Sequence, residues 1–314
     1  MEPATLAIIY QDHDLLIVNK PAGMVIHPTY KHADDTMWNV LLAHLAQQGG
    51  DDWQPATLPD EPGWARAPAA VRVMLREKRV ARAWKEEGLL PRPTLLHRLD
   101  KDTSGIVALA RTERARRHII RQFEQRTISK RYLAVVCAGA PAWTRPRTNF
   151  SVKWLDNAGE HAVPPDMSSL LASPGERLLL DGPVQRDPDD RRRCIVGPAG
   201  QQAATQVNVL AVAGPFRLLE VHPITGRIHQ IRVHLAALGY AIVGDQTYAP
   251  PAVEGTPQAT LKRQFLHAYS LTLRRYPGNE LSTFVAPLAD DLRLWLERND
   301  FAGGVLDARG TLST

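Results

Sequence analysis

The apolar residues of this 314-residue chain come in short runs that alternate with turn-forming residues. Uninterrupted apolar runs, such as residues 15–18, fall far short of the roughly 20 apolar residues that span a bilayer. Short runs rich in β-branched residues predict strands, whereas apolar residues spaced three or four apart predict helices. The two kinds of pattern follow one another without a regular βαβ alternation. The sequence therefore favours an α+β fold over a doubly wound parallel sheet.

The strands predicted from these patterns lie at 5–30 (two strands around a turn), 94–96, 106–110, 132–136, 177–185, 203–213 and 216–222. Helices are predicted at 36–47, 113–126, 227–238 and 288–298. Thr112 is a suitable N-cap for the second helix, and Gly239 is placed to end the third.

Two segments, 48–93 and 141–176, carry scattered proline and glycine and are interpreted as insertions. The first contains a basic amphipathic stretch at about 69–87. The remaining pattern is continuous, so we expect a single domain over residues 1–302 and a frayed tail over 303–314.

The charged residues and cysteines exclude several classes of protein. Acidic residues occur early in the chain, and no basic start is followed by an apolar stretch, so no signal peptide is expected. A cytoplasmic location is the expectation. Two cysteines, Cys137 and Cys194, are too few for a disulfide scaffold and lack zinc-site spacing.

Basic residues are concentrated in two segments. The formal net charge is +5, and residues 111–131 hold eight Lys/Arg against two acids. Residues 72–92 hold seven Lys/Arg against three acids. Clustered cations suit a polyphosphate ligand, because phosphate neutralisation and counterion release supply much of its binding free energy. The alternative interpretation is a solvated basic helix face.

Three polar clusters stand among apolar residues. The first, His97-Arg98-Leu99-Asp100, lies between predicted strands, where unpaired charges are costly. A surface turn with local hydrogen bonds is its structural alternative. The second lies on the predicted helix 227–238, where Arg232 falls at the edge of the apolar stripe and needs a carboxylate unless it reaches water. The third is Lys130-Arg131-Tyr132, where the tyrosine could pack in the core or offer a flat face to a nucleic-acid base.

Other chemistries lack a motif in this sequence. The eleven histidines form no HExxH arrangement, so we expect no metal site. Neither GxxxxGK[ST] nor GxGxxG phosphate loops occur, and GxSxG is also missing. We expect no cofactor.

These clusters, in this order, resemble the RluA family of RNA pseudouridine synthases. HRLDKDTSGIVALART at 97–112 is similar to the catalytic motif of that family, and NKPAGMVIHP at 19–28 to its N-terminal motif. SKRYLAVV at 129–136 and TGRIHQIRVHLAALGYAIVGDQTY at 225–248 resemble the tyrosine and arginine motifs. RQFLHAYSL at 263–271 and FVAPLADDL at 284–292 resemble the C-terminal signatures.

The resemblance implies one catalytic domain with a mixed, mostly antiparallel sheet, flanking helices and a basic cleft. Asp100 would be the catalytic aspartate, Arg232 its ion-pair partner and Tyr132 the residue that stacks on uracil. Arg98 would fill the space that the target base leaves, and Ile231 would line the pocket. The weaker substrate-binding candidates are Lys20, His97, Lys130 and Arg227, and His27 could support the site.

The chain also departs from the family pattern. Ile228, Gln201 and the segment 275–277 differ from the residues usual there, which leaves the identity of the RNA open. The catalytic pattern begins near residue 6, so we expect a form without the small N-terminal RNA-binding domain of many relatives. The partner is expected to be a structured RNA, ribosomal RNA before transfer RNA, and the protein a monomer with no membrane association. Two alternatives stay open: a non-catalytic RNA-binding or ribosome-assembly protein, and a glycosidase-like hydrolase using Asp100.

Overall fold

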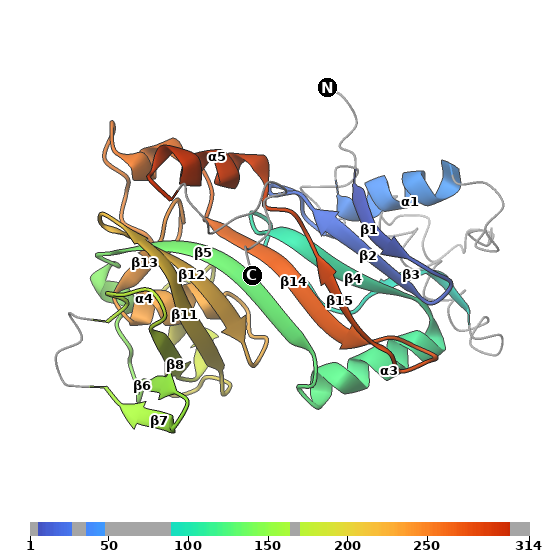
Figure 1. Ribbon diagram of the computed structural model, residues 1–314, viewed down its shortest axis with the longest axis horizontal. Helices are drawn as coiled ribbons and strands as arrows, with labels where there is room; N and C mark the ends of the chain where they lie inside the picture. The colour runs from blue at the N-terminus through green and yellow to red at the C-terminus, as the bar shows by residue number, and fades with distance from the viewer. Residues whose placement is uncertain (1–5, 27–35, 48–88, 164–169, 302–314) are drawn as a thin grey trace. The chain divides into compact units, whose positions relative to one another are not determined.

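The computed structural model describes residues 6–26, 36–47, 89–163 and 170–301 (Figure 1). The chain divides into two compact units, each described by itself below. Unit 1 comprises residues 1–128 and 272–284, and unit 2 comprises residues 129–271 and 285–314. Three predictions concern residues outside the described ranges. They are the supporting role of His27, the basic stretch within the insertion residues 48–88, and the frayed tail 303–314.

Unit 1 is built on a small antiparallel sheet. Strands β1 (Ala7–Gln11) and β2 (Leu15–Lys20) form a hairpin, and β4 (Ser104–Thr112) pairs with both β2 and β3 (Leu89–Leu95). The hairpin turn is fixed by Asp12, whose Oδ1 accepts hydrogen bonds from the backbone N–H groups of Asp14 (2.8 Å) and Leu15 (2.7 Å). Every residue of β4 is buried, as expected for an apolar run covered on both faces.

Among its described residues, unit 1 contains the helices α1 (Met37–Gln47) and α3 (Glu113–Glu124). The predicted N-cap of α3 is confirmed, because Thr112 Oγ1 accepts a hydrogen bond from Ala115 N at 3.2 Å. Ala115 packs with Ala110 of β4, with Leu96 and Tyr276 against them. The helix therefore lies against the strand that leads to it.

Unit 2 contains a larger antiparallel sheet. Its strands are ordered β5 (Ser129–Ala138), β12 (Phe216–Pro223), β11 (Ala204–Ala213), β8 (Arg177–Asp181), β6 (Ser151–Asp156) and β7 (Gly159–Ala162). β13 (Tyr240–Ile242) pairs with β5, and β9 (Val184–Arg186) with β10 (Cys194–Val196) forms a separate two-stranded sheet. Strands β14 (Leu266–Arg274) and β15 (Leu281–Val285) contribute residues to both units.

The segment 141–176, interpreted as an insertion with no predicted strand, contains the hairpin β6–β7 at residues 151–162. Asp156 Oδ1 accepts hydrogen bonds from Ala158 N (2.7 Å) and Gly159 N (3.0 Å), and Gly159 adopts a φ of 129° that glycine permits. β6 also pairs with β8, so this segment extends the sheet. The turn residues Asp156 and Gly159 were visible in the sequence. The two strands are short and largely exposed, so apolar and polar residues do not alternate clearly along them.

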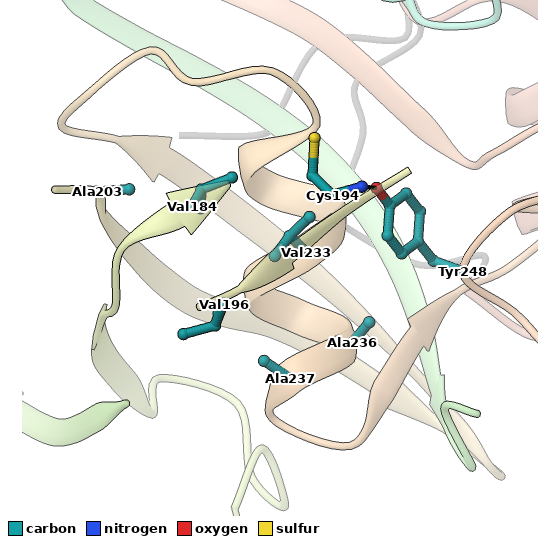
Figure 2. Close-up of a cluster of buried hydrophobic side chains, with 8 residues drawn as sticks. All are labelled: Val184, Cys194, Val196, Ala203, Val233, Ala236, Ala237 and Tyr248. Atoms are coloured by element: carbon teal, nitrogen blue, oxygen red, sulfur yellow. Dashed lines mark hydrogen bonds between the residues drawn. The ribbon is translucent and has the colours of Figure 1, made fainter. Parts of the chain in front are cut away.

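Helices α4 (Gln230–Ala237) and α5 (Asp290–Arg298) belong to unit 2, with the 3₁₀ turns η3 (Ala142–Thr144) and η5 (Pro257–Thr260). Every residue of α4 is buried, and Val233, Ala236 and Ala237 pack with β9, β10 and Tyr248 (Figure 2). The prediction that this helix begins at residue 227 is wrong. His229 adopts a left-handed φ of 56°, so regular helix starts one residue later. Gly239, with a φ of 95°, ends it as expected.

The α+β class is confirmed by these elements. No helix among the described residues is both long and apolar enough to cross a membrane. The expectation of one continuous domain stays a prediction beside the division into two units.

Candidate active-site residues and family membership

Asp100 lies in the turn that joins β3 to β4 in unit 1. The backbone N–H of Thr103 donates to the carbonyl oxygen of Asp100 at 3.1 Å, which closes the turn. Leu99, Thr103 and Ser104 are buried, whereas Asp100 is half-buried and Arg98 is exposed. The turn thus holds the half-buried Asp100 among buried neighbours, and it leaves the side chain of Arg98 exposed.

His97 is engaged with the sheet. Its Nε2 accepts a hydrogen bond from Ala108 N at 3.1 Å, so the neutral ring carries its proton on Nδ1. The ring also packs at 5.7 Å from the ring of Phe123. The sequence predicts that His97 binds substrate. These contacts favour a positioning role, because the ring continues the pairing of β3 with β4 up to the Asp100 turn.

Lys20 connects the N-terminal motif to the same turn. Its side chain is fully buried, and Nζ donates to the carbonyl oxygens of Pro21 (2.9 Å), Met24 (3.0 Å) and Lys101 (2.8 Å). A buried ammonium needs such partners to offset its lost hydration. The structure therefore favours a role in holding residue 101, next to Asp100, over the direct substrate contact that the sequence predicts.

A pocket of about 490 Å³ lies beside this turn in unit 1. Its walls combine apolar side chains with two cations, and they are formed by Val25, Ile26, Leu95, Leu96, His97, Arg98, Leu99 and Lys101. The N-terminal motif at 19–28 and the Asp100 motif at 97–112, far apart in the chain, thus meet around one cavity.

In unit 2, Arg232 forms a buried bidentate ion pair. Its Nε lies 2.7 Å from Asp245 Oδ2, and an Nη lies 2.8 Å from Oδ1. The side chains of Arg232 and Asp245 are 7% and 0% exposed, so the pair is desolvated. The expectation that Arg232 needs a carboxylate is confirmed, whereas its expected position at the edge of the apolar stripe is wrong, because every residue of α4 is buried. The carboxylate that provides it, Asp245, was not predicted.

The partners of Arg232 are themselves fixed by further contacts. Asp245 Oδ1 accepts from the backbone N–H groups of Thr247 (2.9 Å) and Tyr248 (3.0 Å). The guanidinium carbon of Arg232 lies 4.8 Å from the centre of the Tyr248 ring. Tyr248 OH in turn accepts from Cys194 N at 2.7 Å (Figure 2) and lies 2.9 Å from His229 Nδ1. Arg232 is therefore held in one orientation by the carboxylate of Asp245 and the ring of Tyr248, and the turn at 245–248 fixes both of these groups.

Lys130 lies next to the start of the arginine motif. Its Nζ is 3.4 Å from the carbonyl oxygen of Thr225, and a Cβ added at Gly226 would lie 3.6 Å from it. Burial lowers the pKa of Lys130 to about 8, because the charged form loses hydration. Arg227, two residues from Thr225, is half-buried and donates from Nε to Gln202 O at 3.2 Å.

Tyr132 and Ile231 are both buried, at 9% and 6% exposure. Tyr132 lies on β5 opposite Val221 of β12. The candidate residues are thus divided between the two units. In unit 2, Lys130 and Tyr132 lie on β5, Arg227 on the loop after β12, and Ile231 and Arg232 on α4. Unit 1 holds the other four, Lys20, His97, Arg98 and Asp100.

Asp245 and Tyr248 are the residues that sequence reasoning missed. Both lie within the motif at 225–248, but they come after the helix that carries Arg232. A buried arginine on a helical wheel predicts that an acid is needed without saying which. In the sequence, Gly244 indicates a turn just before Asp245, and in the structure this glycine adopts a φ of 75°.

Comparisons with known proteins identify the family of this chain. A family model described as RNA pseudouridylate synthase matches residues 14–237. An uncharacterized RNA pseudouridine synthase of Chloroflexus aurantiacus is 34% identical over 280 residues, which cover 89% of this chain and 65% of that protein. Ribosomal large subunit pseudouridine synthase D of Nitrosomonas europaea is 29% identical over 299 residues, 94% of this chain and 66% of that protein. The chain thus spans slightly less than two thirds of the length of these two curated relatives.

The solved structure of human RNA pseudouridylate synthase domain containing 4 has the same fold. It aligns with a TM-score of 0.56 at 22% identity and covers 93% of this chain and 92% of that chain. The family model matches more than two thirds of the sequence and includes the Asp100 turn, β5 and the helix of Arg232. The chain belongs to the RNA pseudouridylate synthase family, as its resemblance to the RluA members predicted.

Proposed function

We propose that this protein isomerises particular uridines of a structured RNA to pseudouridine, with Asp100 as the catalytic residue. The observation that carries the proposal is the family match over residues 14–237, which spans both the Asp100 turn and the buried Arg232. The relatives named ribosomal large subunit pseudouridine synthase D support ribosomal RNA as the substrate, with transfer RNA second.

The reaction exchanges one glycosidic bond for another within the same nucleotide. The uracil N1–C1′ bond breaks, the base turns, and a C5–C1′ bond forms. The proton on C5 is released, and N1 gains a proton, so atoms balance with no redox change and no group donor. The Asp100 carboxylate would act by attacking the sugar carbon, by attacking the uracil ring, or by removing the ribose 2′ proton.

The remaining residues have distinct proposed roles. Arg232 would stabilise the ionised form of Asp100, since a nearby cation favours a charged carboxylate. Tyr132 would stack on uracil, and Ile231 would line the pocket. The target base must leave the RNA stack at a cost of a few kcal/mol, and Arg98, exposed beside Asp100, would occupy the vacated space. Lys130 and Arg227 would contact the RNA backbone.

Tritium release tests this proposal. RNA labelled with tritium at uracil C5, from a strain that lacks this protein, is incubated with the enzyme, and tritium in water is counted. Release, followed by mapping of the modified position, would establish the reaction and the substrate. If ribosomal and transfer RNA bind tightly but release nothing, the non-catalytic alternative is favoured. Free uracil in the products would indicate the hydrolase.

Replacing Tyr132 with phenylalanine should preserve folding and RNA affinity, because the ring that would stack on uracil remains. Base stacking on an aromatic ring contributes about 1–3 kcal/mol. We therefore expect the Kd for RNA to stay within about threefold for Tyr132→Phe and to rise more for Tyr132→Ala, measured by filter binding. A large loss of affinity in the phenylalanine variant would argue against simple stacking.

The pKa of Lys130 predicts a pH-dependent KM. Because burial lowers this pKa to about 8, the ammonium is charged below pH 8 and loses its proton as the pH rises through that value. If the charge contacts a phosphate, KM for RNA should rise several-fold between about pH 7 and pH 9. Lys130→Arg should remove the rise, because arginine stays protonated. Parallel KM profiles of wild type and variant would exclude Lys130 as the titrating group.

A further inference from the structure

The outer face of α3 carries a row of arginines that the proposed catalytic roles do not use. Arg114, Arg117 and Arg121 are exposed and, at about 100° per residue, lie within an arc of about 60° on the helix. Arg126 follows at the exposed end of the helix. These four residues are called the α3 ridge.

The ridge keeps most of its charge. The acid nearest in sequence, Glu113, is largely buried, and it pairs with Arg116 at 2.6 Å and Arg117 at 2.9 Å. Those cations lower the pKa of Glu113 to about 2, so it is ionised and already neutralised. Within the described residues, Arg114, Arg121 and Arg126 have no acidic partner. The single exposed carboxylate of α3 is Glu124, which lies three residues after Arg121 on the same side of the helix and offsets one charge of the ridge.

The ridge stands on a rigid support. Ala115 and Ile119 are completely buried beneath it, and Thr112 caps the helix. At the other end, Gln122 exchanges two hydrogen bonds with the backbone of Arg274, at 2.8 and 2.9 Å. This contact adds a fifth exposed guanidinium beside the helix, since the side chain of Arg274 bonds only to the carbonyl of Asn279 among its described contacts. A fixed row of cations is pre-organised to bind an extended polyanion.

We propose that the α3 ridge binds the phosphate backbone of the substrate RNA that flanks the target uridine. This inference rests on the proposed function for the identity of the partner. Arginine matches phosphate bidentately, and phosphate contacts set position and affinity without reading sequence. The chemistry therefore fits an RNA stem of any sequence.

Contacts within unit 1 place one end of the ridge near the proposed chemistry. The ring of Phe123, in the last turn of α3, lies 5.7 Å from the ring of His97, three residues before Asp100. At about 1.5 Å per residue, the helix rises roughly 10 Å from Arg114 to Arg121. The row therefore runs along α3 from near the Asp100 turn, where it can meet the RNA that flanks the target uridine.

The test compares a triple variant, Arg114→Gln with Arg121→Gln and Arg126→Gln, with wild type on a long structured RNA. Glutamine keeps helix propensity, and Arg117 is left in place because it pairs with Glu113. On the long RNA we expect KM to rise by about 10-fold and the salt dependence of binding to weaken by about two phosphate contacts. The kcat at saturating RNA should stay at the wild-type value.

The matched control is Arg145→Gln with Lys262→Gln and Arg298→Gln. These residues are exposed in unit 2, and the control lowers the net charge by the same three units. The control should leave KM on the long RNA unchanged. An equal rise in both variants would mean general charge attraction and would overturn the ridge. An unchanged KM and salt slope in the ridge variant would also overturn it and would leave an acidic protein surface as the partner.

The two proposals fail in distinguishable ways. If wild type releases no tritium from any RNA, the proposed function fails, while filter binding of the long RNA still reports on the ridge. If wild type is active and the ridge variant binds like wild type, only the ridge fails. Thermal melting of both triple variants, expected within a few degrees of wild type, shows that these comparisons concern folded protein.

Discussion

Asp100→Asn should release no measurable tritium from RNA labelled at uracil C5, a loss of at least about 10⁴-fold or roughly 5.4 kcal/mol in the activation barrier. Asparagine has nearly the same shape but carries no charge, so it can neither attack carbon nor accept a proton as a carboxylate does. The turn should persist, because it is closed by the backbone carbonyl of residue 100 and anchored by buried Leu99 and Thr103. We therefore expect the melting temperature and the Kd for RNA to remain close to wild type.

Asp102→Asn is the matched control for this prediction. Asp102 lies two residues further in the same turn and is also half-buried, so its replacement makes the same chemical change in nearly the same place. Its activity should stay within about 10-fold of wild type. If Asp100→Asn turns over normally, the assignment of Asp100 is wrong. If both variants are inactive and wild type produces free uracil, a two-carboxylate hydrolase would explain the data better.

Arg232→Ala should lower kcat by several orders of magnitude and should also destabilise the fold. Two separate causes operate. Without the guanidinium, Asp100 would lose the cation proposed to keep it ionised and oriented. In addition, Asp245 would remain as a buried carboxylate without its bidentate partner, a loss that typically costs about 3–5 kcal/mol of folding free energy. Tritium release and chemical denaturation measure the two effects independently.

A double variant separates the catalytic cause from the structural one. Arg232→Gln with Asp245→Asn removes both charges and leaves two neutral groups able to hydrogen-bond, so stability should recover most of the way to wild type. Activity should stay as low as in Arg232→Ala. Recovery of activity together with stability would show that Arg232 acts only by holding the fold, and would remove it from the proposed mechanism.

Local patterns predicted most of the secondary structure. The N-cap at Thr112, the buried strand around residues 106–110 and the helix end at Gly239 were all predicted, because each depends on interactions over a few residues. The errors have equally local explanations. The helix of Arg232 starts late because His229 takes a left-handed conformation that no pattern in its neighbours requires. The hairpin at 151–162 was missed because its side chains are too exposed to alternate clearly.

The candidate site was predicted less evenly. Resemblance supplied Asp100, Tyr132 and Arg232, since their motifs are specific in sequence. The environment of each residue was hidden, because it depends on segments far apart in the chain. Lys20 was proposed to touch substrate, yet it is buried on the carbonyl of residue 101, 81 residues away. His97 was proposed likewise, yet its ring accepts a hydrogen bond from β4.

The sequence by itself determined the α+β class, the family and the residue types that the reaction needs. These follow from short-range periodicity, from turn chemistry and from motifs that are continuous in the chain. Only the tertiary structure decided that Asp245 is the carboxylate of Arg232, that Lys20 supports the Asp100 turn, and which arginines of α3 keep their charge. Such pairings are set by which strands lie side by side and by which charges lose their water. Neither the neighbours of a strand nor the burial of a charge can be read from the spacing of residues along the chain.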